Sequence, residues 1–190
     1  MAFIVISIIG ECMMNIDIEG ITICKINNGI LIKSEKPLYA LANRKGFDFQ
    51  FIKEFDTHYS NTPNLKRVLV KRNGIDVITS VEFFEKKYFS TISILIDASL
   101  DNLTLLNIFR VTTESISTVM WENNAINEDD LSNKLGNYYN IVFVACTSKS
   151  DKEVPFDVSL YYEVKELVDE ALKKSLEHIN NTEKTNRGRL

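Results

Sequence analysis

The stretch YFSTISILIDASLDNLTLLNIFRVTTESISTVMWEN, residues 88–123, reads as a strand that leads into a helix. Residues Tyr88 to Ile96 are mostly apolar and β-branched and end at Asp97, which predicts a strand. From about Asp101 to Asn123 the apolar residues recur at helical spacing, and Ser99 or Asp101 can cap the helix. The apolar stripe consists of Leu105, Ile108, Phe109, Thr112, Ile116, Val119 and Met120.

Three further segments extend this pattern toward the C-terminus. The continuous apolar run Ile141–Ala145 is typical of a central buried strand. An amphipathic helix is expected from about Leu160 to His178. A short helix is expected to start near 61–64 and to run through about Arg72, with Asn73-Gly74 as its end. The inward residues of the last helix are Val164, Leu167, Val168, Ala171, Leu172 and Leu176.

The first third of the chain predicts strands. Residues 1–9 are apolar and β-branched, and 21–26 and 30–33 flank an Asn-Asn-Gly hairpin turn. A short apolar run follows at 38–42, after Pro37. Segment 47–55 alternates apolar and polar residues, which indicates an antiparallel strand with one aromatic face. The aromatic residues expected on that face are Phe47, Phe49, Phe51 and Phe55.

These elements predict an α/β (α+β) fold. We expect a single domain over residues 1–179, with one mixed, largely antiparallel sheet and about three helices packed on it. Residues 180–190 have almost no apolar content and are expected to form a flexible tail.

The composition narrows the classes of partner. The chain has 190 residues, 45% of them hydrophobic, and a net charge of -4, which argues against nucleic acid as a partner. The apolar N-terminus lacks the preceding positive charges of a signal peptide and is too short to span a membrane. We therefore expect a cytoplasmic protein with no membrane contact. Three widely spaced cysteines and two distant histidines predict no metal site.

Several motifs resemble the adenosylcobinamide amidohydrolase family. Residues 93–100, SILIDASL, and the following Asn107, Thr113 and Glu114 look like the family's "NI-hydrophobic-D-A-x-L" strand and "LVNA…TEAKT" helix. Residues 76–81, DVITSV, are similar to its "G-hydrophobic-TAA-V" element, and Ile141–Ala145 to its late buried strand. The likeness extends over roughly residues 38–172.

The resemblance implies a function in corrinoid salvage. Members of this family hydrolyse the amide that joins aminopropanol to the corrin ring of adenosylcobinamide, which yields adenosylcobyric acid. It implies a corrinoid substrate and no required cofactor. The ligand-binding residues that we expect on this basis are Asn107, Thr113, Ser117, Thr79, Gly136 and Asn140.

The chain departs from the family pattern at two loops. Only Gly46 stands where the family has a Gly-rich stretch in its first third. The family's "GTGTD" loop reads Gly136-Asn137-Tyr138-Tyr139-Asn140 here, so Asn140 takes the place of the aspartate. A relative that binds a corrinoid without cleaving it is therefore an alternative.

Glu114, His58 and Asp56 are the candidate catalytic residues. A partly buried Glu114 could act as a base for water, while a solvent-facing glutamate is the plain alternative. Asn107, Glu114 and Ser117 share one helix face, which lines either a ligand cleft or polar surface. Asp56 could orient His58, two residues later; the alternative for His58 is a surface loop position.

Three functions therefore remain in comparison: a hydrolase, a binding protein without turnover, and a partner-binding domain with no small ligand. Turnover separates the first two, and stabilisation by the ligand separates the second from the third. The oligomeric state is left open, a homodimer included.

Overall fold

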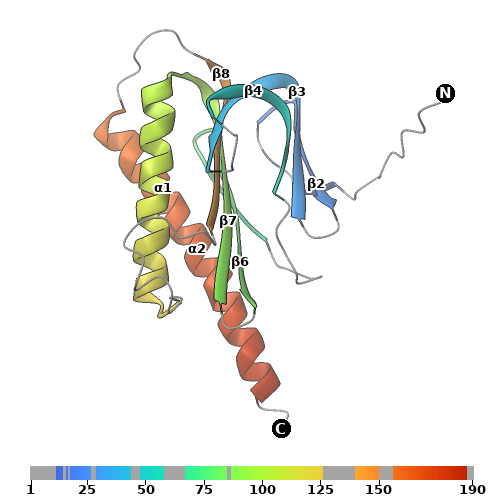
Figure 1. Ribbon diagram of the computed structural model, residues 1–190, viewed down its shortest axis with the longest axis vertical. Helices are drawn as coiled ribbons and strands as arrows, with labels where there is room; N and C mark the ends of the chain where they lie inside the picture. The colour runs from blue at the N-terminus through green and yellow to red at the C-terminus, as the bar shows by residue number, and fades with distance from the viewer. Residues whose placement is uncertain are drawn as a thin grey trace, which may run out of the picture.

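The computed structural model describes residues 12–14, 16, 18–26, 29–43, 48–57, 67–84, 87–125, 140–149 and 156–187. These form one eight-stranded sheet in the order β1-β2-β3-β8-β7-β6-β5, with β4 paired to β3, and two helices (Figure 1). The elements are β1 Cys12–Met14, β2 Ile21–Ile26, β3 Gly29–Ala42, β4 Gln50–Asp56, β5 Val68–Arg72, β6 Ile75–Phe84, β7 Lys87–Leu100, α1 Asn102–Glu122, β8 Asn140–Lys149 and α2 Val158–Arg187. The predicted mixed fold with one sheet is confirmed.

The centre of the sheet is the parallel pair β7 and β8, and α1 connects them. β8 lies between β7 and β3, so the prediction of a central buried strand is confirmed. α1 begins where the periodicity places it, because the Asp101 carboxylate accepts a hydrogen bond from the Thr104 backbone N–H at 2.7 Å. All other described strand pairs are antiparallel.

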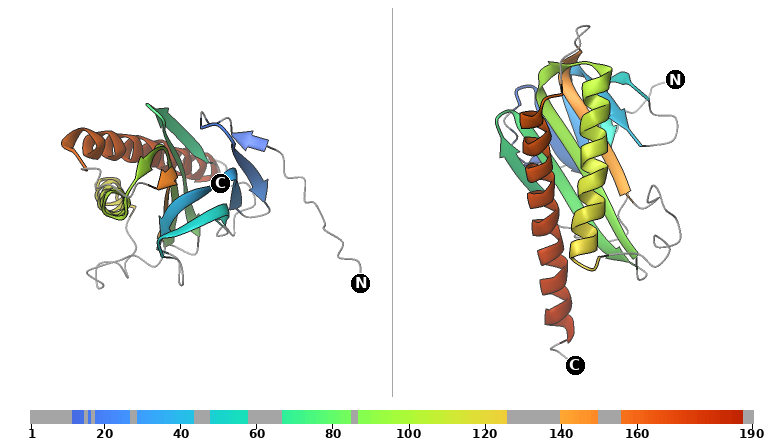
Figure 2. Two further views of the ribbon diagram at one scale, coloured as in Figure 1. Left: turned by 90° about the horizontal axis from the view of Figure 1, so that it is seen from above. Right: turned by 90° about the vertical axis from the view of Figure 1, so that its left-hand side faces the viewer.

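Both helices cover the same face of the sheet (Figure 2). α2 packs on β5 and β6, and α1 packs on β8, β3 and α2. The inward residues predicted for α2 are all buried in this core. α2 ends at Arg187 and not at the predicted His178. The apolar periodicity that predicted its end stops at Leu176, and the helical backbone continues beyond that residue. The flexibility expected for 180–190 stays a prediction.

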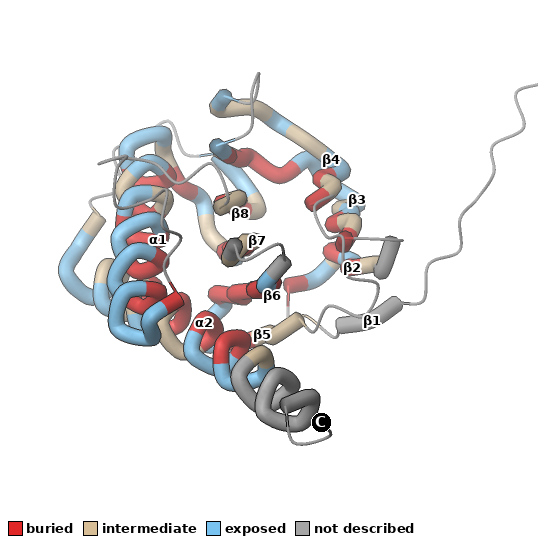
Figure 3. The backbone as a smooth tube through the Cα atoms, turned by 60° about the horizontal axis from the view of Figure 1, so that its bottom comes forward, coloured by how far each residue is buried: buried red, intermediate tan, exposed pale blue. Residues whose placement is uncertain are grey.

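The opposite face of the sheet holds a second core, against which β2, β3 and β4 curve (Figure 3). The prediction that the aromatic residues of segment 47–55 share one face is wrong for Phe51 and Phe55. Phe51 is paired with Tyr39 and is exposed, whereas Phe55 is paired with Ile32 and is buried in the second core. The register between β3 and β4 shifts between Lys33 and Leu38, which changes the face to which later residues point.

The short helix predicted up to Arg72 is wrong: residues 68–72 are β5. Asn73 and Gly74 have φ values of 50° and 77° and form the two-residue turn that pairs Arg72 with Ile75. Two successive positive φ angles are typical of a type I′ hairpin, which accounts for the Asn-Gly pair. The described residues therefore contain two helices and not about three.

Two segments predicted as separate strands, 30–33 and 38–42, belong to the single strand β3. Pro37 lies between the part of β3 that pairs with β2 and the part that pairs with β8. A proline has no N–H to donate, and at this place the described registers require none.

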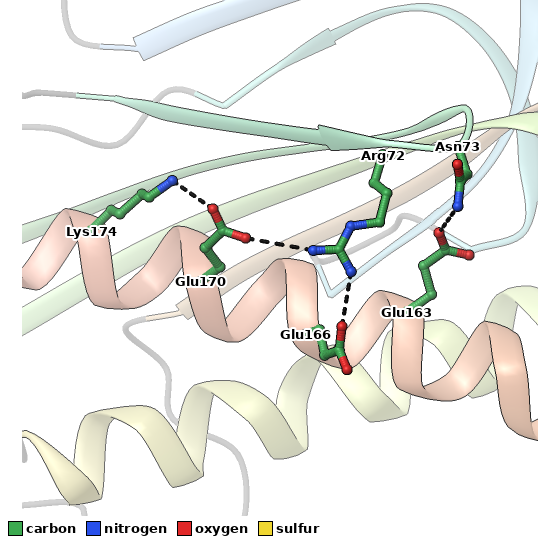
Figure 4. Close-up of polar contacts among 6 residues, drawn as sticks. All are labelled: Arg72, Asn73, Glu163, Glu166, Glu170 and Lys174. Atoms are coloured by element: carbon green, nitrogen blue, oxygen red, sulfur yellow. Dashed lines mark hydrogen bonds and ion pairs between the residues drawn. The ribbon is translucent and has the colours of Figure 1, made fainter.

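Polar contacts join the β5–β6 turn to α2 (Figure 4). Arg72 lies 2.8 Å from Glu166 and 3.8 Å from Glu170, and the Asn73 carboxamide donates to Glu163 at 2.6 Å. Since these side chains are largely exposed, each ion pair stabilises the fold by about 1 kcal/mol or less. Within the described residues neither helix is long and apolar enough to cross a membrane.

Candidate functional site

The first residues of β8 meet the residue that follows β3 and the first part of β7 in a polar cluster. We call Asn43, Ser90 and Asn140 the amino-edge cluster, after the amino end of β8. Asn140 is paired with Ser90, and its Oδ1 accepts a hydrogen bond from the Ser90 hydroxyl. The Asn43 side chain donates to the Asn140 carbonyl oxygen at 2.7 Å.

Thr79 lies on β6, on the same face of the sheet as Ser90 and Asn140. It stands one row further along and two strands from Asn140. Its neighbours Val77 and Val81 belong to the core under the helices, and alternation along β6 points all three toward that core. Val81 is paired with Ser90 and Thr79 with Ile92, so Thr79 and Ser90 are diagonal neighbours at about 7–8 Å.

The Thr79 hydroxyl is buried without a partner. The residue is 1% exposed, and its Oγ1 has no hydrogen-bond partner in the described part of the chain. Most buried polar atoms are hydrogen-bonded, because leaving one unpaired costs free energy. The cross-strand partners of Thr79 are the apolar Val68 and Ile92, so the nearest polar group of the amino-edge cluster is the diagonal Ser90.

The polar residues predicted to share one face of α1 point away from the core under the helices. Glu114 is about half exposed, and its Oε1 lies 3.5 Å from Nε of Arg110. The hydroxyls of Thr113 and Ser117 donate to carbonyl oxygens one turn earlier in α1, at 3.0 and 3.1 Å. Asn107 is half-buried on the same helix. Glu114 is therefore a solvent-facing glutamate and not a partly buried base.

The other predicted residues are separate from α1. Asp56 is half-buried at the end of β4, paired with Leu31. Asp56 therefore lies away from the part of β3 around Tyr39, which pairs with β8. His58 and Gly136 are outside the described residues. Of the nine predicted site residues, Thr79 and Asn140 share one face of the sheet, two strands apart, and the described α1 residues and Asp56 lie on two other surfaces.

The carboxyl end of β8 offers a second group of reactive side chains, centred on Cys146. Burial raises the pKa of its thiol, and its Sγ lies 3.0 Å from the Ser148 carbonyl oxygen. Burial also raises the pKa of Tyr39, whose hydroxyl donates to the Asn102 side chain. Because both groups keep their protons to higher pH, they are poor nucleophiles at neutral pH. Cys146 is therefore best explained as a buried residue of the core.

The amino-edge cluster contains hydrogen-bond donors and no carboxylate. Hydroxyl and carboxamide donors of this kind can hold a carbonyl oxygen and stabilise negative charge that develops on it. No group of three or more His, Cys, Asp or Glu side chains in the described residues is placed to hold a metal ion.

Sequence reasoning missed Asn43 and Ser90. Asn43 and Asn140 are 97 positions apart, and a cross-strand register is needed to see that they meet. The only local signal was the position of Asn43 directly after an apolar run.

Comparison of the chain with protein-family models, curated proteins and solved structures finds no match. The resemblance to the adenosylcobinamide amidohydrolases therefore stays a hypothesis that rests on the motifs quoted above.

Proposed function

We propose that the protein hydrolyses the amide bond between aminopropanol and the corrin ring of adenosylcobinamide. One observation supports the proposal beyond the motifs. Thr79 and Asn140, which the resemblance names independently in two distant segments, lie in neighbouring rows on one face of three adjacent strands. The Thr79 hydroxyl itself is buried and has no hydrogen-bond partner in the described part of the chain.

In this proposal the amino-edge cluster binds the scissile carbonyl group. Water attacks the carbonyl carbon, the carbon–nitrogen bond breaks, and the departing amine takes a proton. The Asn140 carboxamide would stabilise the oxyanion formed on the carbonyl oxygen, whereas the Thr79 hydroxyl, two strands away, does not reach the same atom. The group for proton transfer stays open, because the predicted Glu114 and Asp56 lie on other surfaces than this cluster and His58 is outside the described residues. The proposal includes a cytoplasmic location, a corrinoid substrate, no required cofactor and no nucleic-acid partner, with a homodimer open.

Binding without turnover is the second candidate, and Asn140 favours it. A carboxamide cannot take a proton from water, whereas the aspartate at this position in the family can. Asn140→Asp keeps the oxygen that accepts from Ser90 and replaces the NH₂ group by a second acceptor. This variant therefore separates loss of a proton acceptor from loss of the site.

The test incubates the purified full chain with adenosylcobinamide and follows adenosylcobyric acid by chromatography. Asn140→Ala and Glu114→Gln are assayed beside the wild type. Thr118→Val is the control, because its exposed hydroxyl donates to a carbonyl of its own helix at 3.0 Å. Product from the wild type and control, and about a hundredfold less from Asn140→Ala, would support the hydrolase and this site.

Other outcomes decide between the candidates. Full activity in Asn140→Ala would remove the amino-edge cluster from the reaction. A melting temperature that rises with the corrinoid, without product, would favour the binding protein, and product from Asn140→Asp alone would strengthen that conclusion. A folded wild type with neither product nor stabilisation would reject both candidates.

A further inference from the structure

Asn43 holds the start of β8 by three hydrogen bonds after the regular pairing of β3 has ended. Its backbone N–H donates to the Val142 carbonyl oxygen at 3.2 Å, and its Oδ1 accepts from the Val142 N–H at 2.8 Å. Its Nδ2 donates to the Asn140 carbonyl oxygen at 2.7 Å. Asn43 thus uses its main chain and its whole carboxamide to fix residues 140–142.

Ser90 holds the Asn140 side chain from the neighbouring strand. Ser90 is 2% exposed, and its hydroxyl donates to Asn140 Oδ1. The backbone carbonyl and the side-chain oxygen of Asn140 are therefore both engaged, one by β3 and the other by β7. A carboxamide fixed by its oxygen has its NH₂ group fixed as well, because the group is planar.

The NH₂ group of Asn140 is the part of the side chain left for another molecule. No described residue accepts a hydrogen bond from it, and Asn140 is half-buried. An NH₂ group has two donors and no acceptor, so it matches a carbonyl oxygen.

We propose that Asn43 and Ser90 are positioning residues that hold the Asn140 carboxamide with its NH₂ group toward an amide carbonyl oxygen of the ligand. The inference rests on the proposed function for the identity of that ligand. It goes further in assigning Asn140 as a donor and in naming the two residues that orient it.

The kinetic test uses Ser90→Ala, which removes the hydroxyl, and Ser90→Thr, which restores it. With adenosylcobinamide as substrate, we expect kcat about tenfold lower in Ser90→Ala, with KM changed less than twofold and activity recovered in Ser90→Thr. Ser99→Ala is the matched control, because Ser99 is an exposed serine at the far end of the same strand. An unchanged kcat in Ser90→Ala, at equal melting temperature, would overturn the positioning role.

A measurement without ligand separates this inference from the proposed function. In ¹⁵N spectra of the wild type, one Asn43 side-chain NH₂ proton should exchange more slowly with solvent than the other, since it donates to the Asn140 carbonyl oxygen. The Asn140 side-chain signals should shift in Ser90→Ala and stay in place in Ser99→Ala. Unshifted signals would overturn the positioning of Asn140. A wild type that neither cleaves nor binds adenosylcobinamide would reject the ligand, while these spectra would still decide the positioning.

Discussion

At the scale of single residues, Thr79 links stability to function. Its hydroxyl is buried and has no partner among the described residues, which is unfavourable for the folded protein. Thr79→Val keeps the shape and removes the hydroxyl, so we expect the free energy of unfolding to rise by about 1 kcal/mol. Urea denaturation measures the change. Thr112→Val is the matched control: Thr112 is equally buried, but its hydroxyl donates to the Ile108 carbonyl oxygen at 2.8 Å.

The control should move the other way, with a loss of about 1 kcal/mol for the lost hydrogen bond. A destabilised Thr79→Val would mean that the hydroxyl is satisfied in the folded protein and would weaken its assignment as a ligand-binding group. The residue-scale predictions also show what sequence can supply. Thr79 and Asn140 came from motif likeness, but which hydroxyl lacks a partner depends on packing and cannot be read from the sequence.

Cys146 gives a prediction about pH at the same scale. Burial raises the pKa of its thiol, and an unfolded cysteine titrates near pH 8.5. Above that pH the unfolded chain loses the proton first, so the folded state binds more protons and the free energy of unfolding falls as pH rises. Cys146→Ala should flatten this fall between about pH 8 and 10. Denaturation curves at several pH values would show equal slopes if the thiol played no part.

At the scale of elements, the β5–β6 hairpin depends on its Asn-Gly turn. Gly74 has a φ of 77°, and a Cβ added there would meet Asp97 Cβ at 3.5 Å, an ordinary contact. The cost of Gly74→Ala is therefore conformational, and we expect a loss of about 1–2 kcal/mol in thermal or urea unfolding. A helix-ending Gly would also have positive φ, which is why the sequence alone supports either structure.

A comparison of elements shows where sequence reasoning succeeds. α1, α2 and β8 were predicted because each is long and has one clear apolar pattern. The hairpin at 73–74 was missed because five residues of β5 are too few to show a period. Pro37 led to the prediction of two strands, although it lies inside β3, between the part that pairs with β2 and the part that pairs with β8. The register shift beside β4 depends on strand pairing, so the fate of Phe51 and Phe55 could not follow from alternation alone.

At the scale of the whole molecule, two cores share one sheet, and the central strands touch both. Ile94 and Val144 are fully buried in the core under the helices, whereas Leu95 and Phe143 are fully buried in the core on the other face. Because β7 and β8 hold both cores together, their opening requires most of the fold to unfold. The amino-edge cluster lies at one end of this pair, on the part of the sheet that we expect to be most rigid.

Hydrogen exchange tests this view of the molecule. Backbone amides in the middle of β7 and β8 should exchange slowest, with a free energy of opening equal to that of global unfolding. The edge strands of the described sheet order, β1 and β5, each pair on one side only and should open at lower free energy. Exchange measured residue by residue under native conditions gives both values. Early exchange in β8, before β5, would mean that the parallel pair is not the stable centre, and the amino-edge cluster would then sit on a strand that opens independently.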